Sequence, residues 1–197
     1  MNRFEKAIAG IDDANSADPN RVHVDGKAVP AELAYGRRMT AMLVRFHPEA
    51  SEALRLAVRA QHIRRWEVPR STYPMDRGGY LRWRKDLGRR HAEWTGEILA
   101  GCGYGAEEIA RVGSLLRKEN LRRDAETQAL EDMAALVFLA HYAEDFAAKH
   151  APDKVVGILA KTLGKMSEHG KAAAATLDLP TAIRRALEAA AAQATDP

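Results

Sequence analysis

Apolar residues recur every three to four positions along most of this chain, which is the spacing of one face of an α-helix. Prolines, glycines and short polar clusters separate the periodic segments and mark where each helix begins and ends. The pattern predicts helices over residues 2–10, 30–45, 48–62, 79–101, 106–116, 124–142, 153–169 and 180–192.

The segments between these helices show no pattern typical of a sheet. Apolar and polar residues nowhere alternate for more than a few positions, so we expect no strands. The polar stretch 11–29 is predicted to be a linker with a turn at Asp25-Gly26, and Pro69 and Pro74 predict an ordered loop between two helices. The sequence therefore predicts an all-α fold, an irregular or orthogonal helical bundle, as one domain over residues 1–192 with a frayed tail at 193–197.

Composition supports a folded protein and narrows its class. The chain has 197 residues, 46% of them hydrophobic and 29% charged, which suffices for one sizeable core and excludes disorder as the main state. The lone cysteine, Cys102, excludes an internal disulfide framework. No run of about 18 apolar residues occurs and no signal peptide is evident, so we expect a cytoplasmic protein with no membrane partner.

Charge is concentrated in one part of the chain, residues 62–94, which we call the basic-aromatic segment. Eleven basic and three acidic residues lie between Arg55 and His91, although the whole chain carries a net charge of only +3. All three tryptophans fall inside the segment. Arginines interleaved with aromatic side chains can bind phosphate bidentately, although such a run can also be a solvated helix face with tryptophans in the core. The predicted substrate-binding residues are Arg65, Trp66, Arg70, Tyr73, Arg77, Tyr80, Arg84 and Lys118.

Imidazole and carboxylate side chains at apolar helical positions suggest a second kind of chemistry. His62, His91 and Asp132 form a ligand set that suits a divalent ion such as manganese, iron, nickel or zinc. Glu119 or Glu131 would then orient a water molecule as the catalytic residue. Their spacing matches no compact metal motif, and a buried histidine satisfied by a neighbouring group is the ordinary alternative.

The order of these residues resembles the HD-domain phosphohydrolases, which hold metal with a histidine, a His-Asp doublet and a last aspartate. By that resemblance His62 matches the first histidine and Asp132 the last aspartate. His91 matches the doublet but is followed by Ala92, and the alternative alignment on Lys85-Asp86 lacks the histidine. The resemblance implies an HD-like fold and metal-dependent hydrolysis, with half of the doublet missing.

A more extensive resemblance covers roughly residues 1–190. By the phrases QHIRRWEVPRSTYPMDRGGYLRWRKDL, RRHAEW and QALEDMAALVFLAHYAEDFAAKH, the chain is identified as a member of domain-of-unknown-function family 4202. This family implies no particular reaction.

Two functions are therefore predicted. The first is a metal-dependent phosphohydrolase-like protein that acts on a nucleotide or small phosphorylated metabolite. The second is a non-catalytic module that binds an anion or RNA through the basic-aromatic segment. The oligomeric state cannot be predicted from the sequence.

Overall fold

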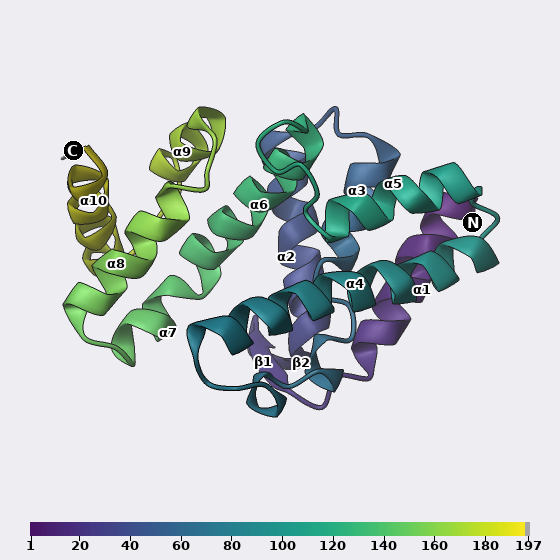
Figure 1. Ribbon diagram of the computed structural model, residues 1–197, viewed down its shortest axis with the longest axis horizontal. Coiled ribbons are helices and arrows are strands. Elements are labelled where there is room, and N and C mark those ends of the chain that lie inside the picture. The colour runs from purple at the N-terminus through teal and green to yellow at the C-terminus, as the bar shows by residue number, and fades with distance from the viewer. Residues whose placement is uncertain (196–197) are drawn as a thin grey trace. The chain divides into compact units, whose positions relative to one another are not determined.

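The computed structural model describes residues 1–195 and is helical apart from one short hairpin (Figure 1), which confirms the predicted all-α class. None of the described helices is both long and apolar enough to cross a membrane. The helices are α1 (Arg3–Ser16), α2 (Ala31–Phe46), α3 (Glu52–Ala60), α4 (Arg77–Gly101), α5 (Ala106–Leu116), α6 (Ala125–His141), α7 (Ala143–Ala148), α8 (Pro152–Leu163), α9 (Glu168–Ala175) and α10 (Thr181–Thr195).

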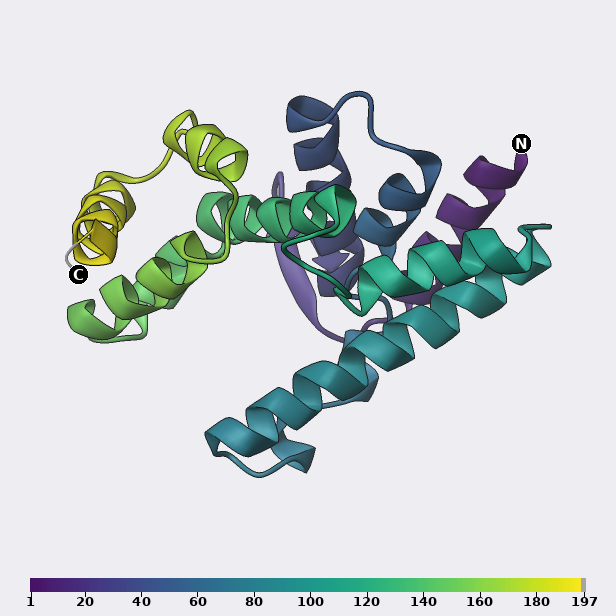
Figure 2. The same ribbon diagram turned by 45° about the horizontal axis from the view of Figure 1, so that its top comes forward.

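The chain divides into two compact units. The first, Met1–Asn120, contains α1 to α5 and the hairpin, and the second begins at Leu121 and contains α6 to α10. In the first unit, α5 packs along the C-terminal half of α4 (Figure 2) and also contacts α3, while α2 packs on α3. The fully buried core side chains of this unit include Ile11, Met39, Leu43, Leu56, Leu99 and Leu115.

The first helix is longer than predicted, because Gly10 does not end it. α1 continues to Ser16, and a Cβ at Gly10 would lie 2.9 Å from Ile98 Cγ2. Glycine therefore allows α1 to approach α4 closely. The polar residues beyond it, predicted to be a linker, bind other elements instead: both carboxylate oxygens of Asp12 accept hydrogen bonds from Arg59, each at 2.6 Å.

The prediction of no strands was wrong at one place. Strands β1 (Arg21–Val24) and β2 (Lys27–Pro30) pair antiparallel, with Val22 opposite Val29. The predicted turn at Asp25-Gly26 joins them, and both residues have positive φ, at 50° and 76°, as a type I′ hairpin turn requires. Four residues a side are too short to give a clear alternating pattern.

Several helix boundaries differ from the prediction because polar side chains cap the helices. α3 begins at Glu52, four residues after Pro48, where the Ser51 hydroxyl accepts from the Leu54 amide. α4 begins at Arg77, where the Asp76 carboxylate accepts from the Gly79 amide at 2.6 Å. The predicted helix 153–169 ends early, as α8 at Leu163, and a separate helix, α9, begins at Glu168 with Ser167 as its cap.

The chain forms two 3₁₀ turns in this region, Arg65–Glu67 before Pro69 and Arg70–Thr72 between Pro69 and Pro74. At the other end of the chain, α10 includes residues 193–195 of the predicted tail. Residues 196 and 197 lie outside the described part of the chain.

Asp132 organises the second unit. Its carboxylate accepts hydrogen bonds from the backbone amide of Ser167 at 2.9 Å, from the Ser167 hydroxyl and from Gln128 Nε2 at 3.0 Å. A Cβ at Gly170 would lie 2.5 Å from Asp132 Cγ, so α9 can approach this carboxylate only because it carries glycine there. Asp132 thus fixes the start of α9 against α6.

This arrangement predicts opposite effects for two glycine substitutions. We expect Gly170→Ala to lower the free energy of unfolding by about 1–3 kcal/mol, because the added methyl group overlaps the Asp132 carboxylate. We expect Gly157→Ala, in α8 with nothing within 4 Å of the added Cβ, to raise it by up to about 1 kcal/mol. Denaturant unfolding of both variants measures the two effects. Equal effects would show that Asp132 does not constrain α9.

Candidate functional site

Two of the predicted metal ligands, His62 and His91, lie together in the first unit. His62 follows the end of α3, and His91 lies in the middle of α4. Their ring centroids are 6.3 Å apart. The chain turns sharply after His62 because Arg64 adopts the left-handed conformation, with φ at 51°, and its amide donates to Asn15 Oδ1 at 3.0 Å.

The His62 ring is held by three side chains. Tyr35 stacks on it at 3.8 Å between centroids, with the planes 10° apart. Nδ1 lies 3.1 Å from Glu32 Oε2, and Arg65 Nη1 lies 3.2 Å from Nδ1 and 3.1 Å from Nε2. A neutral ring protonated on Nδ1 satisfies these partners, since it donates to Glu32 and accepts from Arg65 at Nε2.

Glu32 and Tyr35 were not predicted from the sequence. Both lie in the first two turns of α2, whose start is fixed by Asp18, which accepts a hydrogen bond from the Glu32 amide at 2.9 Å. Their spacing of three places them on one helix face. The sequence gives no signal, however, that the start of α2 meets the end of α3.

Burial and neighbouring charges keep both imidazoles neutral. Burial lowers the pKa of His62 well below its ordinary value, and the nearby cations Arg65, Lys118 and Arg84 lower it further. The pKa of His91 is also well below its ordinary value, through burial and then His62, Arg65 and Lys118. Burial raises the pKa of the Glu32 carboxyl to about 7, although Arg65 opposes this shift.

Buried polar atoms near this pair lack partners. His91 is only 5% exposed, and its Nε2 has no hydrogen-bond partner in the described part of the chain. The same holds for the hydroxyl of Thr95, one turn later on α4, and for Oε1 of Gln61, next to His62. Native proteins satisfy nearly all buried polar atoms, so these atoms are available to ordered water or to a bound molecule.

Tryptophans hold two of the arginines in place. The Arg65 guanidinium lies 5.1 Å from the centre of the Trp83 ring, and Trp83 Nε1 donates to the carbonyl of Val68 at 2.8 Å. Arg64 lies 4.9 Å from the Trp94 ring. Trp83 is almost fully buried, so it serves the core and positions a cation at the same time.

Other residues of the basic-aromatic segment stabilise its loop. Arg70 donates to the carbonyls of Tyr73, Pro74 and Asp76, at 2.9, 2.7 and 3.2 Å. The Tyr73 hydroxyl donates to Asp86 Oδ2 at 3.0 Å. The predicted contact of Arg70 and Tyr73 with substrate stays a prediction. Of the remaining predicted substrate-binding residues, Trp66 and Arg84 are half-buried, whereas Arg77 and Tyr80 are exposed on α4.

Lys118 and Glu119 follow the end of α5. Lys118 has a positive φ of 55° and lies close enough to both histidines to lower their pKa values. Glu119 is exposed and accepts a hydrogen bond from Arg117 Nε at 2.7 Å. Glu131 and Asp132 are buried on α6, in the second unit. Within the described residues, no group of three or more His, Cys, Asp or Glu side chains is arranged to hold a metal ion.

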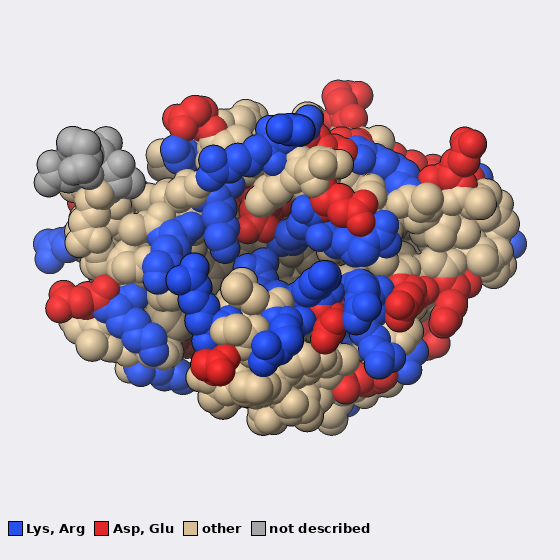
Figure 3. All heavy atoms as spheres, in the orientation of Figure 1, with Lys and Arg blue, Asp and Glu red and all other residues tan. Residues whose placement is uncertain are grey.

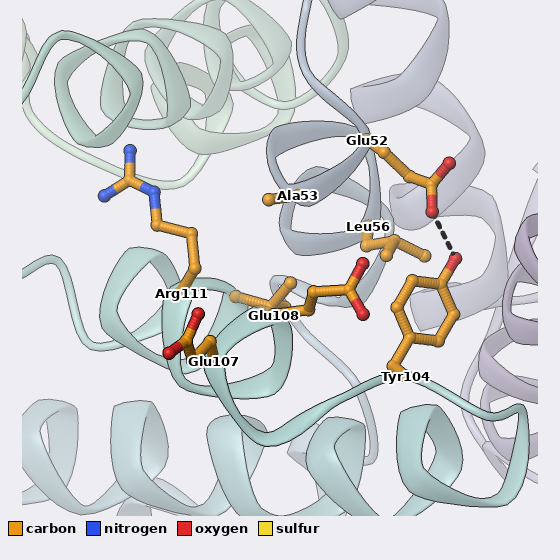
Figure 4. Close-up of a pocket in the computed structure, with 8 residues that line it drawn as sticks. Glu52, Ala53, Leu56, Tyr104, Glu107, Glu108 and Arg111 are labelled. Atoms are coloured by element: carbon orange, nitrogen blue, oxygen red, sulfur yellow. Dashed lines mark hydrogen bonds between the residues drawn. The ribbon is translucent and has the colours of Figure 1, made fainter.

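A hollow in the first unit lies elsewhere. It measures about 280 Å³ and lies between α3 and α5, with Leu56 in its lining (Figure 4). Several of its polar side chains already have partners: the Tyr104 hydroxyl donates to Glu52 at 2.7 Å, and Glu108 accepts from Arg3, outside the hollow, at 2.6 Å. Neither histidine lines it, so the candidate site is the His62–His91 cluster.

The lowered pKa values predict that the protein loses stability in mild acid. The unfolded chain takes up protons on His62 and His91 below about pH 6.5, whereas the folded state resists this protonation. Glu32 has the opposite effect on the free energy of unfolding between its ordinary pKa of 4.5 and its raised pKa of about 7. The two histidines together outweigh this single carboxyl group. The free energy of unfolding should therefore fall as the pH falls from 6.5 towards 5.

Denaturant unfolding of a His91→Gln variant at several pH values checks this. We expect the variant to lose most of the acid-induced destabilisation, because His62 and Glu32 then nearly cancel. A His23→Gln variant, which changes an exposed side chain of β1, should behave as the wild type. A slope unchanged by His91→Gln would refute the account.

Comparison with known proteins gives a family but no named relative. No curated protein and no solved structure matches the chain. The profile of the family described as "Domain of unknown function (DUF4202)" matches residues 5–187, which includes both units. It therefore covers α1 from its third residue, α2 to α9 with both histidines of the candidate site, and the first seven residues of α10. The chain belongs to the DUF4202 family.

Proposed function

We propose that the first unit binds the phosphate group of a nucleotide or small phosphorylated metabolite. The site consists of His62, His91, Arg65, Arg84 and Lys118. The observation that carries the proposal is a pair of neutral imidazoles among three cations, one buried (His91) and one half-buried (His62), with the Nε2 atom of His91 unpaired among the described residues. A bound phosphate would accept hydrogen bonds from the cations and give His91 a partner.

The contacts of His62 favour an anion over a metal ion. Its two ring nitrogens already face Glu32 and Arg65, and a metal ion would have to displace one of them. Arg65, Arg84 and Lys118 would repel a cation, whereas they would attract phosphate, since like charges raise and unlike charges lower the free energy at these distances.

The same geometry provides a base for hydrolysis, and we extend the proposal to this reaction. Phosphate binding would offset the nearby cations and so raise the pKa of His62. Once Arg65 turns from the His62 ring to the bound phosphate, Nε2 of His62 would accept a proton from a water molecule as the water oxygen bonds to phosphorus. The bond from phosphorus to the leaving oxygen breaks, and that oxygen keeps the electron pair. Glu32 would stabilise the imidazolium through Nδ1.

Metal-dependent hydrolysis is a second candidate. The observation that favours it is the His62–His91 pair itself, because two imidazoles 6.3 Å apart can share one ion after small side-chain movements. The sequence predicts Asp132 as the third ligand and Glu119 or Glu131 as the residue that orients water. Asp132 would have to release hydrogen bonds to Ser167 and Gln128. Arg65 would also have to leave the His62 ring.

Removal of Lys118 tests the phosphate site. Because Lys118 occupies a left-handed conformation that glycine adopts readily, Lys118→Gly removes the charge without backbone strain. We expect affinity for inorganic phosphate and nucleoside monophosphates, measured by calorimetry, to fall about tenfold, since charge-assisted hydrogen bonds contribute about 1.5–3 kcal/mol.

Asn120→Gly is the matched control, because Asn120 also has a positive φ, at 56°, but carries no charge. We expect it to bind phosphate as the wild type does. Equal affinity of Lys118→Gly and wild type would refute the proposed site.

Chelation distinguishes the two candidates. If phosphate binds directly to the cationic side chains, dialysis against EDTA should leave its affinity unchanged. Under the metal mechanism, both phosphate binding and the metal content of protein purified without chelator should be lost on chelation, and also in Asp132→Ala. Calorimetry with elemental analysis of the same samples decides between them.

A further inference from the structure

A row of side chains along α4 leads from the exposed Arg77 through the half-buried Arg84 to the buried His91 of the His62–His91 cluster. Arg77, Arg84 and His91 recur every seven residues, so they lie on nearly the same side of the helix. Each step of seven advances about 10.5 Å along the helix axis, and the row therefore spans roughly 21 Å. Arg84 is close enough to the cluster to lower the pKa of His62.

The exposed cations on this side of α4 are not neutralised. Lys85 lies about 80° around the helix from Arg77, and neither of these exposed side chains has an ion pair or hydrogen bond in the described part of the chain. The two acidic residues of this stretch are already engaged: Asp76 caps α4, and Asp86 binds Arg89 and Tyr73. Figure 3 shows lysine and arginine side chains gathered over the region of α4. This face therefore attracts a polyanion.

Exposed apolar side chains accompany the cations at the start of α4. Met75, Tyr80 and Leu81 are 79%, 43% and 56% exposed, and they are three of the five exposed large hydrophobic residues in the described chain. The Arg84 guanidinium lies 5.9 Å from the centre of the Tyr80 ring. An accessible aromatic ring beside cations is the combination on which single-stranded nucleic acids stack and bind.

The end of α5 meets this face next to the cluster. A Cβ at Gly88, between Arg84 and His91, would lie 3.4 Å from Arg117 Cα and 3.4 Å from the Leu116 carbonyl oxygen. Lys118 follows Arg117 directly in the chain. A polyanion bound along α4 would therefore reach Lys118 and the two histidines at one end of the row.

We infer that the phosphorylated substrate is the end of a single-stranded nucleic acid. Its terminal phosphate occupies the His62–His91 cluster, and the following nucleotides lie along α4 from Arg84 towards Arg77, with a base on Tyr80. This inference rests on the proposed phosphate site. It adds that recognition extends beyond one nucleotide, and that the basic-aromatic segment forms both the site and the track leading to it.

The test compares a 12-nucleotide oligouridine RNA with a 5′-phosphate and uridine monophosphate. Arg77→Glu/Lys85→Glu reverses two exposed cations of the face that do not belong to the proposed phosphate site. Arg21→Glu/Lys27→Glu changes the net charge equally on the hairpin, where both residues are exposed and unpaired among the described residues. Fluorescence anisotropy over a range of salt concentrations gives the affinity for the RNA, and calorimetry gives that for the mononucleotide.

We expect Arg77→Glu/Lys85→Glu to lower the RNA affinity about tenfold or more at low salt. Loss of two phosphate contacts should reduce the slope of log affinity against log salt by about 1.4. Mononucleotide affinity and the hairpin variant should match the wild type. Tyr80→Ala should weaken RNA binding without changing the salt slope, since stacking carries no charge.

Other results would overturn the inference, each in a distinct way. Equal losses in the α4 and hairpin variants would indicate attraction by net charge alone. If the α4 variant leaves the RNA affinity unchanged while mononucleotide binding still depends on Lys118, the phosphate site exists but α4 does not bind the rest of the RNA. Binding to vesicles with anionic lipid, but not to RNA, would assign this face to a membrane surface. RNA binding that needs α4 but not Lys118 would refute the link to the site.

Discussion

The position of the His62 ring is the constraint on which the candidate site depends. Three elements meet there: α2 supplies Glu32 and Tyr35, the turn after α3 supplies His62 and Arg65, and α4 brings His91. The stacked Tyr35 ring and the two polar contacts leave the imidazole little freedom to rotate. Because the ring is buried beside cations, it is held neutral, and the pair of histidines can respond chemically only when another charge enters.

Most of the helical organisation could be predicted from the spacing of apolar residues. The prediction succeeded where a helix has a regular apolar face and a proline or glycine boundary, as in residues 106–116, which are α5. The prediction failed where a glycine or a polar side chain contacts a residue that is far away in the sequence. Gly10 looked like a helix end but provides room for Ile98, and Asp12 and Asn15 looked like linker residues but bind Arg59 and Arg64. Such contacts are tertiary, and no local pattern reports them.

The candidate site could be predicted only in part, because it also depends on contacts between residues that are far apart in the sequence. The concentration of charge and aromatic residues in one segment identified where to look, and the structure brings the two histidines of that segment together. Glu32 and Tyr35 belong to a helix whose sequence is ordinary, so only the fold reveals them. Asp132 was predicted as a metal ligand because it is an acidic residue within an apolar stripe. A buried acidic residue can equally have a structural role, and the hydrogen bonds that Asp132 accepts from Ser167 are such a role.

The length of α4 has a mechanical consequence. It is a single helix of 25 residues, from the Asp76 cap to Cys102, without a proline, and it is about 37 Å long. Its C-terminal half is packed against α5, whereas the loop held by Arg70 adjoins its other end. A stiff rod clamped along one half acts as a lever, because a force applied at its free end produces a torque where it is held. A force on the Arg77 end would therefore tilt α4 against α5, and His91 would move with the helix.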